Sequence, residues 1–192
     1  MWRLWFLTML ALGFALPAFA DRDIDSRAFA TNATLSAEDV TASASTAIAT
    51  LDPNPGAPGY AWLRIHFYGF APDADDIAGA IKGDIRSMDR KWNALAANPA
   101  AYRSSFAVLQ LTIDDHANVT QVDMSVPGHA CTIAPFAPDV RKFLQAYRFD
   151  EQRLSLKSEG SYVCNMAFMG IPDQTFSWDI DLIDIPVFAK AN

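Results

Sequence analysis

Apolar and polar residues alternate along several short stretches of the chain. The clearest cases are residues 60–70, 106–113, 119–126 and 176–182. A period of two places neighbouring side chains on opposite faces of a sheet, so each stretch predicts a strand with one buried side. Together these stretches indicate an antiparallel sheet that is covered by protein on one face only.

Other segments have the spacing of an amphipathic helix. The first covers residues 73–97, where apolar residues follow one another at steps of three and four. The second begins at Pro138 and has apolar residues at i, i+3, i+4 and i+7 as far as Tyr147. A third, short helix is predicted near residues 37–50, because Ser36 can cap a helix ahead of a stretch rich in Ala and Thr.

The order of these elements predicts an α+β fold. From residue 60 the chain runs strand, helix, strand, strand, helix, and then a strand from Leu154, with an extra strand before the C-terminus. This order matches the ferredoxin-like βαββαβ arrangement, in which two main helices cover one face of an antiparallel sheet. A curved antiparallel sheet that grips the long helix, with a different strand order, accounts for the same elements.

The first 20 residues have the pattern of a secretory signal peptide. A basic start with Arg3 precedes a short apolar run, which ends at the small-residue site Ala18-Phe19-Ala20. The run is shorter than the roughly 20 apolar residues that a membrane-spanning helix needs. An uncleaved N-terminal anchor is the alternative. Residues 21–59 are predicted to form an N-terminal arm that ends in a Pro/Gly-rich linker, and residues 60–192 a single α+β domain.

Charge narrows the range of partners. The chain has 15 Lys and Arg against 22 Asp and Glu, a net charge of −7, and −8 remains once residues 1–20 are removed. Because this charge repels phosphate groups, we expect no nucleic-acid partner. We expect no membrane span after signal cleavage and no cofactor, and the oligomeric state stays open. The predicted location is periplasmic or secreted, with an envelope protein or a small ligand as the partner.

The two cysteines, Cys131 and Cys164, predict a disulfide. An even number of cysteines in an exported chain favours pairing, and a loop of this length would be stabilised by about 4 kcal/mol on a chain-entropy estimate. Two free thiols or a metal pair are the alternatives, although a zinc site normally has four ligands. Because the sequence has no C-x-x-C motif, the bond would be structural and not redox-active.

One face of the strand at residues 60–70 is a candidate ligand site. Trp62, Arg64, His66 and Tyr68 share this face and combine stacking surface, a cation and a titratable base. The alternative is that residues 21–50 cover the face and that His66 lies buried beneath them.

His129 is the second candidate, because it lies in a Pro-Gly loop beside Cys131 and loops often carry function. His116 follows Asp114 and Asp115 in a predicted hairpin turn, which lacks the ligand spacing of a calcium loop. We therefore predict a polar hairpin tip there and no metal site.

The sequence has none of the short catalytic motifs that fix a reaction, such as G-x-S-x-G or H-E-x-x-H. The expected function is therefore a binding or accessory module of the cell envelope. The alternatives are an extracytoplasmic hydrolase that uses His66 or His129 with an Asp, and a structural envelope protein without a specific small ligand.

Overall fold

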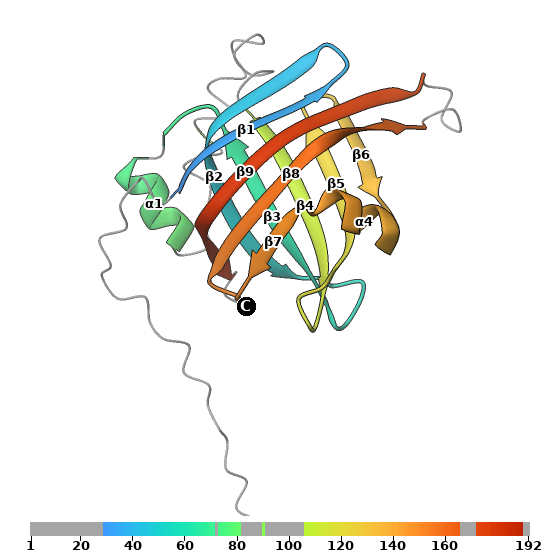
Figure 1. Cartoon of the computed structure of the whole chain (residues 1–192). Coiled ribbons are helices and arrows are strands. Elements are labelled where there is room, and N and C mark those ends of the chain that lie inside the picture. Colours follow the sequence, from blue (N-terminus) through green and yellow to red (C-terminus); the bar gives the residue numbers. More distant parts are fainter. Residues whose placement is uncertain (1–28, 72, 82–89, 91–105, 166–171, 190–192) are drawn as a thin grey trace, which may run out of the picture.

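The computed structural model describes residues 29–71, 73–81, 90, 106–165 and 172–189. These residues form one curled sheet, in which strands follow the order β6-β5-β4-β3-β2-β1-β9-β8-β7 (Figure 1). Every neighbouring pair in this order is antiparallel. The elements are β1 Ala30–Ala37, β2 Val40–Pro53, β3 Tyr60–Tyr68, α1 Ala74–Ile81, β4 Phe106–Asp114, β5 Val119–Val126, β6 His129–Ala134, α4 Ala137–Phe143, β7 Ala146–Phe149, β8 Arg153–Cys164 and β9 Gln174–Ala189.

The sheet bends back on itself. In Figure 1, β1, β9, β8 and β7 lie in front of β2 to β6, and α4 lies on the side where the two ends of the sheet approach each other. The end of β9 also pairs with β2 in parallel, with Ala49 opposite Val187 and Leu51 opposite Ala189. Strand β9 therefore contacts β8, β1 and β2, and it joins the two layers at one end.

Apolar side chains from the concave face fill the space between the layers. Along β4 and most of β9 they alternate with exposed or half-buried residues, as the period of two predicts. The largest fully buried members of this core are Leu35, Leu63, Ile65, Phe67, Leu109, Leu111, Met124 and Phe176. A buried side was predicted for each of these strands, and in β3 it consists of Leu63, Ile65 and Phe67.

The predicted α+β fold is wrong. The described chain is mostly antiparallel sheet, and its two described helices are too short to cover a sheet face in the ferredoxin-like manner. Four strands, β1, β2, β6 and β7, were not predicted from the sequence, and they change both the strand order and the class of the fold. No helix among the described residues is both long and apolar enough to cross a membrane.

Strand β2 replaces the short helix that was predicted near residues 37–50. Buried Val40, Ala42 and Ala44 alternate with exposed Thr41 and Ser43, so the stretch has a period of two in small residues. Alanine favours helices in isolation, but here Ala42 and Ala44 face the core while Thr41 and Ser43 face water. The part of the expected N-terminal arm that the structure describes thus lies within the sheet.

The other two predicted helices, over residues 73–97 and from Pro138, are confirmed only at their starts. Helix α1 begins at Ala74, and the remainder of the predicted 73–97 helix lies almost entirely outside the described residues. Helix α4 ends at Phe143, and Tyr147, expected on the same helix, belongs to β7 instead. Pairing of Tyr147 with Leu156 of β8 supplies the tertiary contact that overrides the helical spacing.

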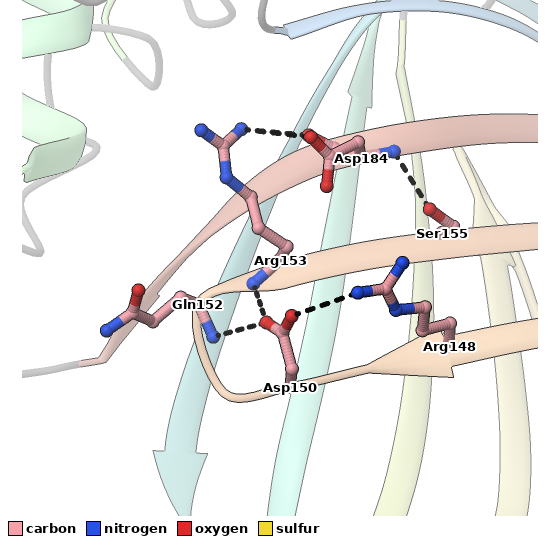
Figure 2. A network of polar contacts seen from close by, with 6 residues as sticks. All are labelled: Arg148, Asp150, Gln152, Arg153, Ser155 and Asp184. Carbon is pink, nitrogen blue, oxygen red and sulfur yellow. Dashed lines mark hydrogen bonds and ion pairs between the residues drawn. The ribbon is translucent and has the colours of Figure 1, made fainter.

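A bulge bends β9 near its end, and polar side chains from β8 support it (Figure 2). Asp184 has a positive φ of 54°. Its backbone N–H donates to Ser155 Oγ at 2.9 Å, and its carbonyl accepts from Arg153 Nη1 at 2.9 Å. The turn before β8 is held by Asp150, whose carboxylate accepts from the backbone N–H of Arg153 at 2.8 Å. Because of this bend, the last residues of β9 lie beside β2 and pair with it.

Candidate functional site at the free edge of strand β8

Part of strand β8 has a free edge. Strand β7 pairs with β8 only as far as Lys157. In the sheet as described, the segment Ser158–Val163 therefore has a strand neighbour on one side only, which is β9. We call this segment the β8 free edge. Val163, which belongs to it, is one of the few large apolar side chains that are exposed, at 57%.

The predicted disulfide is confirmed, and it ties β8 to the far end of the sheet. Cys131 of β6 is bonded to Cys164 of β8, with their Cα atoms 6.1 Å apart. Strands β6 and β8 are not paired in the sheet. The disulfide therefore links β6, at one edge of the sheet, to β8, near the other edge, where no hydrogen bonds between strands join them. We call the boundary between β6 and β8 the seam.

Helix α4 closes the other part of this seam through a chain of buried contacts. Trp178 Nε1 donates to Ser158 Oγ at 2.8 Å, and the Ser158 hydroxyl donates to the carbonyl of Phe143 at 2.6 Å. The rings of Phe143 and Trp178 lie 5.2 Å apart between centroids in a tilted arrangement. A buried tryptophan and a buried serine are thus satisfied by each other and by the end of α4, which fixes α4 against β8 and β9.

A hollow of about 390 Å³ opens beside α4 at this seam. Its apolar lining includes the rings of Phe143, Tyr162 and Trp178, and its charged lining includes Asp139, Lys142 and Glu159. We call it the seam hollow. Its volume lies within the range of about 300–1,000 Å³ for small-molecule sites, which also combine aromatic walls with a few polar groups.

A second hollow, of about 370 Å³, lies on the outer side of the same strand. It crosses β1, β9 and β8, and we call it the outer hollow. Two cross-strand rows meet in it: Ser36, Ser177 and Ser161 lie in one register, and Thr34, Asp179 and Glu159 lie in the next. The outer hollow is therefore lined by hydroxyls and carboxylates.

Gly160 separates the two hollows and lines both of them. A Cβ atom at this position would lie 3.0 Å from Cζ2 of Trp178, so the indole ring occupies the space that a side chain would need. Glu159, Ser161 and Trp178 also line both hollows. The surface is thus continuous from the hydroxylated outer face, over the β8 free edge, to the aromatic seam.

The structure divides the predicted site on β3 into two parts. At one end, the Arg64 guanidinium lies 4.6 Å above the centre of the Trp62 ring. Arg64 also donates to Asp52 Oδ2 at 3.0 Å and to Gln110 Oε1 at 2.9 Å. The cation is therefore already paired with side chains of the neighbouring strands, which agrees better with a structural network than with an open cation site.

At the other end of the same face, Tyr68 is fully buried in a second, smaller core. It packs there with Phe29 and Ile48, and the ring of Phe106 lies 5.7 Å from its own. His66 is half-buried and stacks on Tyr68 at 6.5 Å. Burial, and secondly the charge of Arg64, lower the pKa of His66 from 6.5 to about 4. His66 is thus half-buried and neutral at pH 7.

His129 lies apart from these residues, at the turn between β5 and β6. Its side chain is 17% exposed, and Nε2 lies 3.9 Å from Asp39 Oδ1 of the β1–β2 turn. Its Nδ1 is buried and has no hydrogen-bond partner among the described residues. The structure therefore does not bring His129 together with His66 or with Trp62, and the five predicted ligand residues form no single site.

The hairpin between β4 and β5 is confirmed as a polar turn. Asp114, Asp115 and His116 are close enough together to surround a cation. However, the Asp114 carboxylate already accepts from the backbone of His116 at 2.9 Å and from the backbone of Asn118 at 2.8 Å. These bonds are those of an Asx-type turn, and they explain the cluster without a ligand.

The residues of the two hollows were not identified from the sequence. One signal was present: Gly160 interrupts an otherwise alternating strand, and a glycine inside a strand often marks a close approach or a bulge. The register that places β1 beside β9 could not be predicted from the sequence, because these two strands lie more than a hundred residues apart in the chain.

No known protein family, curated protein or solved structure matches the chain.

Proposed function

We propose that this protein is an exported binding module of the cell envelope and that it binds its ligand at the β8 free edge. The observation that carries the proposal is the pair of hollows, of about 390 and 370 Å³, that adjoin along this one strand. The half-buried Tyr162 ring, the Ser161 hydroxyl and the Glu159 carboxylate border these hollows, whereas Arg64 on the β3 face is already paired with Asp52 and Gln110.

Two further features support this proposal. The signal-peptide pattern of residues 1–20 and the Cys131–Cys164 disulfide are both typical of chains that leave the cytoplasm. In addition, exposed Phe136, at the start of α4, and exposed Val163 belong to elements that border the seam hollow. Large apolar side chains that stay exposed often mark interaction surfaces.

A site-specific crosslinker tests this function. We would place a photoreactive phenylalanine analogue at exposed Ser161, irradiate cells that export the protein, and identify the adducts by mass spectrometry. The matched control carries the same group at Asp115, on the β4–β5 hairpin. Adducts that form from position 161 and not from 115 would support a binding surface here. Equal adducts from both positions, or none from either, would contradict it.

A hydrolase remains the second candidate, because the ion-pair distance of 3.9 Å between His129 and Asp39 provides a His/Asp pair at a turn. Such a pair could orient a base toward a hydrolytic water. The variant His129→Ala should then abolish hydrolysis of a panel of chromogenic esters and glycosides while the melting temperature stays unchanged. Equal turnover by the His129→Ala variant and the unchanged protein would exclude this candidate.

A further inference from the structure

We propose that the ligand of the β8 free edge is an uncharged glycan chain. This inference rests on the proposed binding function and adds the chemical class of the ligand. A sugar ring has an apolar face of C–H groups and an equatorial rim of hydroxyls, so its binding site needs both aromatic surface and paired donors and acceptors. The two hollows supply these two kinds of surface on either side of one strand.

The seam hollow supplies the aromatic part. Tyr162 is half-buried and borders the hollow together with the rings of Phe143 and Trp178. Trp178 cannot turn away from the hollow, because its Nε1 is bonded to Ser158 and its ring packs on Phe143. Phe143 and Trp178 are themselves buried, so the accessible ring is that of half-buried Tyr162. The fixed rings beside it keep this part of the hollow preorganised, which lowers the entropic cost of binding.

The outer hollow supplies the polar part. The hydroxyls of Thr34 and Ser161 can donate and accept, and the carboxylates of Glu159 and Asp179 accept. The hydroxyls of Ser36 and Ser177 already share a hydrogen bond of 2.6 Å. Glu159 and Asp179 lie directly opposite each other on β8 and β9. Like charges in this position destabilise a sheet. Hydroxyls of a bound sugar would donate hydrogen bonds to both carboxylates and so offset the repulsion between them.

The negative charge of the residues that line the two hollows is unfavourable for an anionic ligand. The carboxylates of Asp139, Glu159 and Asp179 line the two hollows, whereas Lys142 is the only cationic residue among the lining residues that the structure describes. The whole chain is also acidic, with a net charge of −7. Phosphorylated, sulfated or uronate-rich polymers would therefore be repelled.

The geometry also disfavours a peptide that adds as a further strand to the β8 free edge. The side chain of Gln145 already donates to the carbonyl of Glu159 at 3.0 Å, and this carbonyl would belong to the new ladder. At the other end, the disulfide holds β6 and β8 only 6.1 Å apart between Cα atoms. Since neighbouring strands are about 4.8 Å apart, no strand fits between β6 and β8 at that point.

Binding of defined hexasaccharides tests the proposal. We would titrate the mature protein with chitohexaose, cellohexaose and maltohexaose by calorimetry, and with a hexamer of polygalacturonate as the anionic probe. We expect at least one of the uncharged hexasaccharides to bind and the anionic probe not to bind. The double variant Glu159→Gln with Asp179→Asn should weaken binding at least tenfold.

The control is the double variant Asp115→Asn with Glu151→Gln, which changes the net charge equally at exposed turns away from the hollows. Its affinity should stay within twofold of the unchanged protein. Glycan binding that both double variants reduce equally, or that neither reduces, would overturn the assignment of the site. Stronger binding of the anionic probe would overturn the assignment of the ligand class.

The remaining outcomes separate this proposal from the binding function itself. No glycan binding, combined with adducts of a protein or another molecule from position 161, would refute the glycan and keep the binding surface. No glycan binding and no adducts from position 161 would refute both.

Discussion

At the scale of single residues, Gly160 is the position where the candidate site depends most on the absence of a side chain. We expect Gly160→Ala to lower the free energy of unfolding by about 1–3 kcal/mol, because the new methyl group would lie 3.0 Å from the fixed Trp178 ring. Thermal unfolding followed by circular dichroism would measure this loss.

Gly56 provides the control for this change, since a Cβ there meets nothing closer than 3.5 Å. The substitution Gly56→Ala, in the turn between β2 and β3, should change stability by less than about 0.5 kcal/mol. Equal effects at the two glycines would show that contact with Trp178 does not set the cost at position 160.

The other residue-scale prediction concerns His66 and pH. Its pKa falls from 6.5 to about 4 on folding, so between these values the unfolded chain binds more protons than the folded chain. The contribution of neutral His66 to stability is therefore complete above about pH 6.5 and is lost as the pH falls toward 4. The loss is at most about 3 kcal/mol, and partial exposure of the ring makes it smaller.

Replacement of His66 by Phe removes this titration. The difference in unfolding free energy between the variant and the unchanged protein, measured by urea denaturation at pH 7 and pH 4.5, should shift in favour of the variant at the lower pH. A difference that stays constant across this range would show that His66 does not titrate on unfolding.

At the scale of elements, the bulge in β9 is held by side chains of β8 and not by a regular ladder. Arg153→Ala would remove the hydrogen bond from Arg153 to the carbonyl of Asp184, and we expect it to cost about 1 kcal/mol. Arg148→Ala in the same network is the control. Its side chain is 81% exposed and lies 3.8 Å from Asp150, so its loss should cost close to nothing (Figure 2). Chemical denaturation of the two variants would separate these values.

Some strands and helices could be predicted from the sequence and others could not. Strands with bulky alternating residues, such as β3, β4, β5 and β9, were predicted correctly, because burial of one face leaves a clear period of two. Strand β2 was missed since its core side consists mainly of alanine, which is compatible with a helix as well as with a strand. Strand β7 is only four residues long, too short for any periodic signal. The short helices could be located only at their first residues, where proline and aspartate mark the start.

The candidate site was less predictable than the fold. Five residues were proposed as ligands from types that often carry chemistry, and the structure pairs or buries several of them. The hollows depend instead on the register between β1, β9 and β8, which brings Ser36 within 2.6 Å of Ser177 although the two lie 141 positions apart. No local pattern encodes such a juxtaposition. The disulfide could be predicted because two cysteines leave a single intramolecular pairing.

At the scale of the whole molecule, the disulfide joins the two margins of the sheet. Replacement of both Cys131 and Cys164 by Ala should lower the free energy of unfolding by about 4 kcal/mol, on the chain-entropy estimate for a loop with a sequence separation of 33. The same variant should loosen the seam hollow, so ligand affinity should fall with stability. Denaturation in the presence and absence of a reductant provides the control, because the reductant should change only the unsubstituted protein.

The position of β9 has a consequence for the order in which the chain acquires its structure. Strands β2 to β6 form a run of neighbours in sequence, so each can pair soon after its predecessor is synthesised. Strand β1, however, keeps one side open until β9 arrives, and β9 is the last of the nine strands described. Pairings over such long separations close slowly, on timescales of milliseconds to seconds. A growing chain would therefore keep an incomplete sheet until β9 has been synthesised.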